Sequence, residues 1–323
     1  MRTEIYGTFG PACGDRDTLE SMFRAGMTGM RLNLSHTDLS DAAEQIAAFH
    51  KAAEAAGTVP TLVVDTQGPE LRLGNLNAPL TLAEGETVAF GTDIPIPEAV
   101  YPALEAGDEV LLDDGKISLR VLEDGSAEVL RGGTLISRKS VKITGKVVSL
   151  PVLTARDIAN LRRAKEYGVT GLLQPFVRSG ADLRELRRTL AENGAGHLKI
   201  FAKIENLEGV RNLEDILPEA DMIVIARGDL GNDMPLWELP GVQKRISATC
   251  RKAGKPFLVV TQMLASMEKS AVPTRAEVSD IFNAVADGAS AVMLTGETAV
   301  GCYPAEAIRY LANTAREAEN WTE

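Results

Sequence analysis

Eight apolar, β-branched segments recur along this 323-residue chain, and a segment with helical periodicity follows each of them. Continuous apolar strands indicate a parallel sheet with helices over its outer side, because a half-exposed strand would alternate polar and apolar residues. Eight such units predict an α/β fold, the closed (β/α)8 (TIM) barrel, with an open doubly wound sheet as the alternative. The predicted strands are 5–9, 29–34, 61–65, 171–176, 199–205, 222–226, 257–262 and 291–295.

The alternation of strand-like and helix-like segments is interrupted once, between about residues 72 and 151. There, short β-like segments alternate with glycine and aspartate turn signals. We interpret this stretch as a small all-β domain inserted after the third barrel strand. The predicted domains are therefore a barrel formed by 1–71 and 152–323, and an insertion formed by 72–151. A domain inserted there leaves the barrel at the carboxyl ends of its strands, so we expect it to act as a lid.

Composition narrows the function classes. A formal net charge of −11 argues against nucleic acid and against anionic membrane surfaces as partners. Three widely spaced cysteines do not form a disulfide framework and are typical of a reduced cytoplasm. The first residues contain no apolar signal segment, and no apolar run approaches membrane-spanning length. We therefore expect a cytoplasmic enzyme or binding protein.

Two short segments carry the strongest chemical signal. KIEN (203–206) and ARGDLG (226–231) both lie where an apolar strand ends, and they supply Lys203, Glu205 and Asp229. Two carboxylates without a neighbouring Cys or His suit a hard divalent cation such as Mg²⁺ or Mn²⁺. A lysine beside that cation suits an anionic substrate that is phosphorylated or forms an enolate. The structural alternative is a pair of solvated carboxylates at strand ends.

Other strand ends add further polar groups to the same predicted rim. Arg31, Asn33 and Ser35 share one face of their strand with period two. Asn33 and Ser35, together with Asp65 and Thr66, supply oxygens that suit a weakly held monovalent cation, which leaves Arg31 for a substrate phosphate. The later strands end in Thr261, Thr295 and Glu297.

At this point the chain resembles the pyruvate kinase family over nearly its whole length. Eight segments carry the resemblance in order: RLNLSH (31–36), DTQGPELR (65–72), DDGKISL (113–119), KIEN (203–206), ARGDLG (226–231), TQML (261–264), PTRAE (273–277) and GETA (296–299). One tetrapeptide would be a weak signal, but eight collinear segments are specific. The resemblance implies a (β/α)8 barrel with a mobile β lid after its third strand.

The resemblance also implies roles for individual residues in phosphoryl transfer from phosphoenolpyruvate to ADP, giving pyruvate and ATP. Catalysis is implied for Lys203, Arg31, Thr261, Thr295 and Glu297, and substrate binding for Arg31, Lys203, Gly228, Asp229 and Thr261. The implied nucleotide-binding residues are Arg31, His36, Arg72, Asp113 and Lys139. The implied metal ligands are Glu205 and Asp229 for Mg²⁺ or Mn²⁺, and Asn33, Ser35, Asp65 and Thr66 for K⁺, with Glu70 matching potassium-dependent members.

Three departures from the family pattern leave alternatives open. Gln67 replaces a usual lysine, the segment 140–145 differs from the usual lid sequence, and the sequence ends at Glu323 just after the eighth predicted helix. We therefore expect a short form without the family's regulatory domain, as a possible homo-oligomer through the barrel. A metal-dependent aldolase or lyase acting on a pyruvate enolate is the alternative reaction. A metabolite-binding paralogue with weak or no activity is the non-enzymatic alternative.

Overall fold

The computed structural model describes residues 2–69, 71–113, 115–146, 148 and 150–322. It separates into two compact units. Unit 1 consists of Met1–Gly68 and Val152–Glu323, and unit 2 consists of Pro69–Pro151. Within the described residues, no helix combines the length and the apolar character that crossing a bilayer requires.

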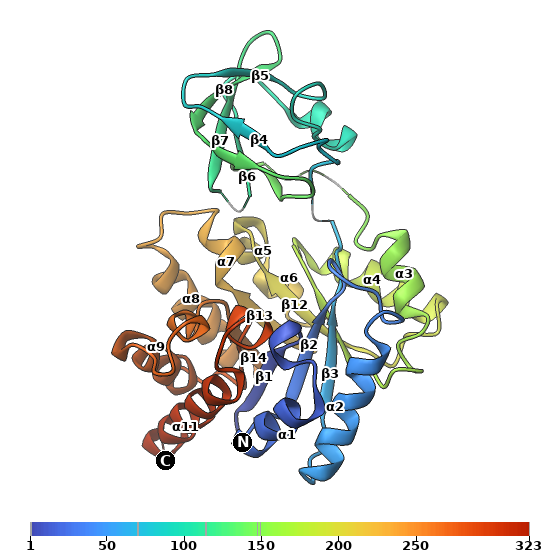
Figure 1. Cartoon of the computed structure of the whole chain (residues 1–323), viewed down its shortest axis with the longest axis vertical. Coiled ribbons are helices and arrows are strands. Elements are labelled where there is room, and N and C mark those ends of the chain that lie inside the picture. The colour runs from blue at the N-terminus through green and yellow to red at the C-terminus, as the bar shows by residue number, and fades with distance from the viewer. Residues whose placement is uncertain (1, 70, 114, 147, 149, 323) are drawn as a thin grey trace. The chain divides into compact units, whose positions relative to one another are not determined.

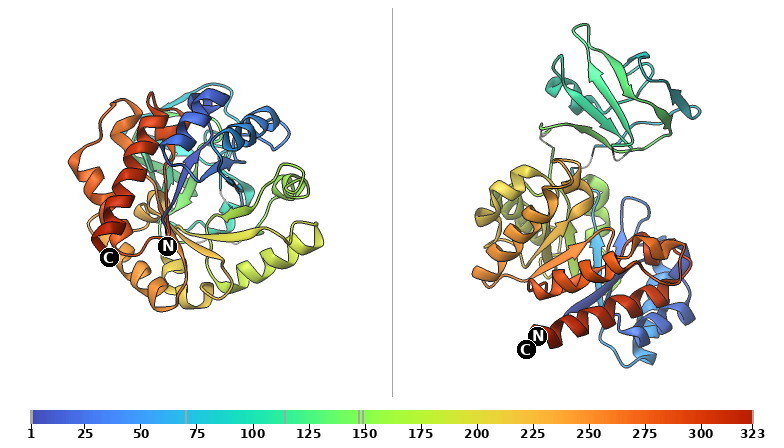
Figure 2. Two further views of the ribbon diagram at one scale, coloured as in Figure 1. Left: turned by 90° about the horizontal axis from the view of Figure 1, so that it is seen from below. Right: turned by 90° about the vertical axis from the view of Figure 1, so that its left-hand side faces the viewer.

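Unit 1 is a closed barrel of parallel strands, which excludes the open doubly wound sheet (Figures 1 and 2). Around the barrel the order is β1-β15-β14-β13-β12-β11-β3-β2, so that β3 and β11 are neighbours although unit 2 separates them along the chain. The strands are β1 Glu4–Thr8, β2 Gly29–Asn33, β3 Thr61–Asp65, β11 Gly171–Gln174, β12 Lys199–Ile204, β13 Met222–Ala226, β14 Phe257–Val260 and β15 Ala291–Met293. Each of these segments overlaps a predicted strand, and the predicted (β/α)8 barrel is confirmed.

Helices surround this barrel (Figure 2). They are α1 Arg16–Ala25, α2 Ala43–Ala55, α3 Ala155–Leu161, α4 Gly180–Glu192, α5 Leu207–Arg211, α6 Leu213–Ile216, α7 Arg227–Gly231, α8 Leu239–Lys252, α9 Arg275–Ala286, α10 Gly296–Ala299 and α11 Pro304–Thr322. Short 3-10 turns cover Pro11–Cys13, Glu98–Ala103 and Ala265–Glu268. Two helices begin with a reciprocal capping box, Thr154 with Asp157 and Thr274 with Glu277.

Strand β12 shows how the barrel positions polar groups. Ile200, Ala202 and Ile204 pack in the outer core beneath the helices, whereas Phe201 packs in the barrel interior. Since side chains alternate along a strand, Lys203 continues the inward face of Phe201 toward the carboxyl end. The inner core fills the barrel with Tyr6, Val63, Leu173, Phe201, Met222, Val224, Ala226, Leu258, Val260, Ala291 and Met293. Above these apolar side chains, the strand ends carry the charged groups.

Unit 2 is built from antiparallel strands around its own apolar core (Figure 1). Five strands form a sheet in the order β10-β6-β7-β8-β5, and β4 pairs with β9. The strands are β4 Leu80–Leu82, β5 Thr87–Ala89, β6 Glu109–Leu112, β7 Ile117–Val121, β8 Ser126–Arg131, β9 Gly133–Leu135 and β10 Val141–Ile143. An all-β insertion was the expectation for this part of the chain.

Candidate active site at the carboxyl ends of the barrel strands

Asp65, the last residue of β3, is the centre of a buried ion-pair network. Its Oδ2 atom accepts hydrogen bonds from Arg31 Nε at 2.8 Å and from Arg31 Nη2 at 2.6 Å. Lys203 Nζ lies 3.2 Å from the same oxygen and 3.3 Å from Oδ1. Burial raises the pKa of Asp65, but the charges of Lys203 and Arg31 outweigh it and hold this pKa below its ordinary value. Asp65 is therefore a carboxylate that fixes two cations.

Lys203 joins this network to Glu205. Its Nζ atom lies 2.9 Å from Glu205 Oε1, and only 14% of the lysine side chain is exposed. Burial lowers the pKa of Lys203, but the carboxylates of Asp65 and Glu205 outweigh burial and keep the pKa above its ordinary value. Lys203 therefore stays an ammonium ion at every physiological pH. It supplies a fixed positive charge and does not act as a base.

Glu205 lies one residue beyond β12 and is almost fully buried. Its Oε2 atom accepts a hydrogen bond from the backbone N–H of Phe176 at 2.9 Å, and Phe176 has a left-handed φ of 52°. Burial raises the pKa of Glu205 to about 7, Lys203 opposes this rise, and the charges of Asp229 and Asp65 reinforce it. Negative charge is thus crowded around Glu205, and a second cation would relieve that crowding.

Glu205 and Asp229 fit a hard divalent cation. Asp229 is in α7, which follows β13 directly, and β13 pairs in parallel with β12. Its charge raises the pKa of Glu205, so the two carboxylates interact electrostatically. Among the described residues, no three or more His, Cys, Asp or Glu side chains are grouped to hold a metal. Two carboxylates leave most coordination positions to water and substrate, as Mg²⁺ and Mn²⁺ sites commonly do.

Gly228 and Thr261 lie against one another beside Asp229. A Cβ atom on Gly228 would stand 3.1 Å from Thr261 Cγ2, so the glycine permits a close approach. Thr261 has φ +82° and Gln262 has φ +55°, although the left-handed region is strained for a β-branched residue. Arg227 stabilises this conformation because its Nη2 and Nε atoms donate to Thr261 O at 2.7 and 3.2 Å.

Arg227 itself is held by α9. Its Nη1 atom forms a 2.6 Å ion pair with Asp280 Oδ2. Arg227 belongs to the ARGDLG segment, for which the sequence predicted roles only for Gly228 and Asp229. Its neighbours in the ARGDLG segment are close in sequence, whereas Thr261 and Asp280 become its partners only through the fold.

Glu297 lies in α10, just after β15, and its carboxylate accepts hydrogen bonds from two segments. Its Oε1 atom accepts from Leu264 N at 3.0 Å, and its Oε2 atom accepts from Thr295 N at 2.8 Å. The Thr295 hydroxyl also donates to Oε2 at 3.3 Å. Glu297 is 1% exposed, and its two oxygens join the segments that follow β14 and β15. Thr295 is only partly buried, so its hydroxyl is the more accessible of these two groups.

The residues predicted to bind a monovalent cation come together at the ends of two adjacent strands. Asn33 and Asp65 are register partners in the β2–β3 pair. Asn33 Oδ1 accepts from Ser35 N at 3.1 Å, and the Thr66 hydroxyl donates to Leu173 O at 3.4 Å. Glu70, which was predicted to mark potassium dependence, lies outside the described residues. A cation site formed by Asn33, Ser35, Asp65 and Thr66 stays a prediction, and Asp65 already has two cationic neighbours, Arg31 and Lys203.

Arg72, Asp113 and Lys139 gather within unit 2. Arg72 forms an antiparallel bridge with Ser140, and its Nη1 atom donates to Arg138 O at 2.9 Å. Lys139 Nζ lies 2.6 Å from Asp113 Oδ1, and Asp113 N donates to Ser140 O at 3.2 Å. Asp113 has a left-handed φ of 50°, beside Gly115 in the same turn. One edge of unit 2 therefore presents the three predicted residues together.

His36 belongs to unit 1 and follows β2. Its backbone N–H donates to Asn33 O at 3.2 Å, so it begins the loop beside the predicted cation site.

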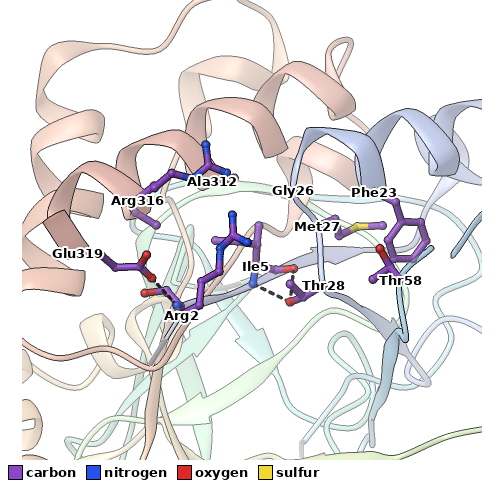
Figure 3. A pocket seen from close by; sticks show the side chains of 12 residues that line it. Arg2, Ile5, Phe23, Gly26, Met27, Thr28, Thr58, Ala312, Arg316 and Glu319 are labelled. Atoms are coloured by element: carbon purple, nitrogen blue, oxygen red, sulfur yellow. Dashed lines mark hydrogen bonds between the residues drawn. The ribbon is translucent and has the colours of Figure 1, made fainter. Parts of the chain in front are cut away.

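A cavity of about 280 Å³ lies at the opposite end of the barrel (Figure 3). Its residues precede or begin β1, β2 and β3, or belong to α1 and α11, as Arg2, Thr28, Thr58, Phe23 and Arg316 show. The charged network described above lies at the other ends of these strands. This cavity is therefore separate from the candidate active site.

Comparisons with known proteins agree with this geometry. A family model described as pyruvate kinase, barrel domain, matches residues 1–308. The chain is similar to curated pyruvate kinases of Geobacillus stearothermophilus (40% identical), Chlamydia pneumoniae (38%) and Corynebacterium glutamicum (39%), each over 98% of this chain. It spans 57% of the length of the first of these relatives, 69% of the second and 70% of the third.

Proposed function

Because the chain belongs to the pyruvate kinase family, we propose that it transfers the phosphoryl group of phosphoenolpyruvate to ADP. The observation that carries the proposal is the Arg31–Asp65–Lys203–Glu205 network beside Asp229, at the barrel end where such folds place their chemistry. In the reaction, the bond between the enol oxygen and phosphorus breaks, and a bond forms between phosphorus and a β-phosphate oxygen of ADP. The enolate then takes a proton on its terminal carbon to give pyruvate.

Positive charge at fixed positions is what this reaction needs, because charge moves onto the enolate oxygen as the phosphoryl group leaves. Lys203 stabilises that charge, and Asp65 and Glu205 hold its ammonium group in place. Arg31 presents a planar fork to the phosphoryl oxygens while Asp65 orients it. Arg31 and Lys203 are already held by these carboxylates in the absence of substrate, so little reorganisation of the side chains is required when it binds.

Glu205 and Asp229 would hold the Mg²⁺ or Mn²⁺ ion, which supplies further charge neutralisation at the substrate oxygens. Gly228 and Thr261 bind the carboxylate end of phosphoenolpyruvate, since Gly228 is exposed and Thr261 lies partly exposed beside it. The hydroxyl of Thr261 or of Thr295 passes the proton to the enolate. Asn33, Ser35, Asp65 and Thr66 would hold K⁺, which would supply additional positive charge to the site.

In unit 1, His36 is a candidate for binding nucleotide phosphates. In unit 2, the candidates are Arg72, Asp113 and Lys139, which share one edge of that unit. Support comes from the two basic side chains on that edge and from the ion pair that orients Lys139. We also propose that the protein works in the cytoplasm, since all three cysteines are unpaired. Self-association through the barrel stays a prediction.

A coupled assay of pyruvate formation tests the proposal. With ADP, Mg²⁺ and K⁺, the wild-type protein should convert phosphoenolpyruvate, and Lys203→Met should lower kcat by about 10²–10³-fold, the range for a lost oxyanion donor. Lys199→Met is the matched control, because Lys199 is exposed at the start of the same strand. Absence of pyruvate formation with any nucleoside diphosphate would refute the function. Equal turnover in both variants would refute the role of Lys203.

A further inference from the structure

The segment that follows β14 contains two consecutive residues with left-handed backbone. Thr261 has φ +82° and Gln262 has φ +55°, although neither is a glycine. A β-branched residue is strained at positive φ, and such strain persists only where the surrounding contacts hold it. Thr261 is also one of the two residues proposed to bind the carboxylate end of phosphoenolpyruvate. The contacts that hold its backbone therefore set its position toward the substrate.

Arg227 makes the contacts that hold the backbone of Thr261. Its Nη2 and Nε atoms both donate to Thr261 O, at 2.7 and 3.2 Å, and Nη2 also lies 3.0 Å from Met263 Sδ. Only 12% of the Arg227 side chain is exposed. Because both nitrogens belong to one planar guanidinium, the carbonyl cannot rotate away without losing both bonds. Arg227 thus acts on the conformation of Thr261.

Asp280 fixes the other side of the Arg227 guanidinium. Its Oδ2 atom lies 2.6 Å from Arg227 Nη1, the nitrogen that does not bond to Thr261 O. Asp280 lies inside α9, which a capping box begins, so the helix fixes the position of its backbone. In a planar group, an ion pair at Nη1 also sets the directions of Nε and Nη2. The orientation of Arg227 therefore depends on Asp280.

Two other carboxylates hold the same segment farther along the chain. Glu297 Oε1 accepts from Leu264 N at 3.0 Å. Glu277 Oε1 accepts from Ser266 N at 2.7 Å. Both contacts lie beyond the left-handed pair, so they do not fix the carbonyl of Thr261. A change that frees this carbonyl should therefore leave the rest of the segment in place.

We propose that Asp280 is a positioning residue for substrate binding, which acts through Arg227 on Thr261. The ion pair keeps the guanidinium where both of its bonds reach Thr261 O. These bonds keep the left-handed backbone that sets Thr261 against Gly228. Without Asp280, the backbone relaxes toward an ordinary conformation, and the Thr261 hydroxyl leaves its place beside Gly228. The inference rests on the proposed function, because phosphoenolpyruvate is the ligand whose binding this arrangement favours.

Asp280→Ala tests the proposal without breaking α9, because alanine is a better helix former than aspartate. Titration calorimetry with phosphoenolpyruvate and Mg²⁺, in the absence of ADP, should show about tenfold weaker binding, since a small misplacement of a substrate contact is costly. The KM for phosphoenolpyruvate should rise by a similar factor, whereas the KM for ADP should stay within about twofold. Asp280→Glu keeps a carboxylate for Arg227 and should restore most of the affinity.

Asp287→Ala is the matched control. Asp287 directly follows the last residue of α9, and its carboxylate forms an ion pair of similar length, 2.7 Å, with Lys244 in α8. That ion pair does not lead to Thr261. A general loosening of α9 would weaken phosphoenolpyruvate binding in both variants, whereas a specific effect belongs to Asp280→Ala. An equal loss of affinity in the two variants would overturn the inference.

A crystal structure of Asp280→Ala gives a readout that does not depend on the substrate. Thr261 should leave the left-handed region and lose its bonds to Arg227, while residues from 264 onward keep their positions. The inference would be overturned if Thr261 kept a φ near +82° and both bonds, or if the affinity for phosphoenolpyruvate were unchanged. A wild-type protein that neither binds phosphoenolpyruvate nor forms pyruvate would instead refute the proposed function. In that case, the conformation of Thr261 in Asp280→Ala still decides whether Asp280 holds it.

Discussion

The pH dependence of divalent cation binding follows from the surroundings of Glu205. Burial, opposed by Lys203 and reinforced by Asp229, raises the pKa of this carboxyl to about 7. A protonated carboxyl is a poor metal ligand, so Mn²⁺ must displace this proton in order to bind. The perturbation is a change of buffer from pH 8 to pH 6, which protonates Glu205 while Asp65, with its lowered pKa, stays ionised.

The expected magnitude is about tenfold. For a ligand of pKa about 7, the apparent dissociation constant is multiplied by roughly 1.1 at pH 8 and by roughly 11 at pH 6. This ratio corresponds to about 1.4 kcal/mol. A carboxyl with an ordinary pKa near 4.3 would change the dissociation constant by only a few per cent over the same range. At pH 6, binding should release about 0.9 proton per ion.

Titration calorimetry with Mn²⁺ in two buffers of different ionisation enthalpy measures both quantities. Glu205→Gln should bind Mn²⁺ more weakly, and the residual binding should be almost independent of pH. A wild-type dissociation constant that is equal at pH 6 and pH 8, with no proton released, would refute the reasoning. It would show that Glu205 is ionised throughout or is not a ligand.

Three further predictions test other parts of the site. In the metal-free protein, the raised pKa of Glu205 makes folding more favourable at low pH, where the carboxyl is protonated. This contribution to stability is lost as pH rises through about 7, so Glu205→Gln should stabilise the protein at pH 8 by up to about 3 kcal/mol. Thermal unfolding measures this effect, and destabilisation would contradict it. Gly228→Ala should raise the KM for phosphoenolpyruvate about tenfold with little change in melting temperature, because its Cβ would press on Thr261 Cγ2; a normal KM would show that the two residues do not bind the substrate. Lys139→Met should raise the KM for ADP about tenfold, whereas Lys116→Met, which removes a longer and more exposed contact with Asp113, should change it less; equal effects of the two variants would argue against a specific phosphate contact by Lys139.

Periodicity alone predicted the barrel, because every strand and helix buries a face whose spacing appears in the sequence. The predicted ends of helices and strands were less accurate. Helical periodicity in the sequence extends over 154–167, but the helix is regular only to Leu161, since Arg163, Ala164 and Glu166 then donate to carbonyls three residues back. In unit 2, the sequence indicated short β-like segments, and the three-residue strands β4, β9 and β10 carry too little alternation to be located from it. The apolar segment 147–150 also predicts a short strand, but it includes 147 and 149, which lie outside the described residues.

The chemical types at the site were visible in the sequence, but their pairings were not. Arg31 was predicted to be available to a substrate phosphate, and the structure shows that two of its nitrogens also contact one oxygen of Asp65. The left-handed conformation of Thr261 depends on Arg227, which is 34 residues away. The bonds from Gln67 and Gly68 to Asp157 likewise span about ninety residues. Such contacts depend on which strand ends become neighbours in the closed barrel, and local sequence does not encode that.

The most direct test of the central claim is the position of a bound Mn²⁺ ion. Crystals soaked with Mn²⁺ should show an anomalous scattering peak within about 2.3 Å of carboxylate oxygens from both Glu205 and Asp229. Lys203 should remain in contact with Asp65 beside it. An anomalous map with no peak between these two carboxylates, at a Mn²⁺ concentration that saturates binding in solution, would contradict the account.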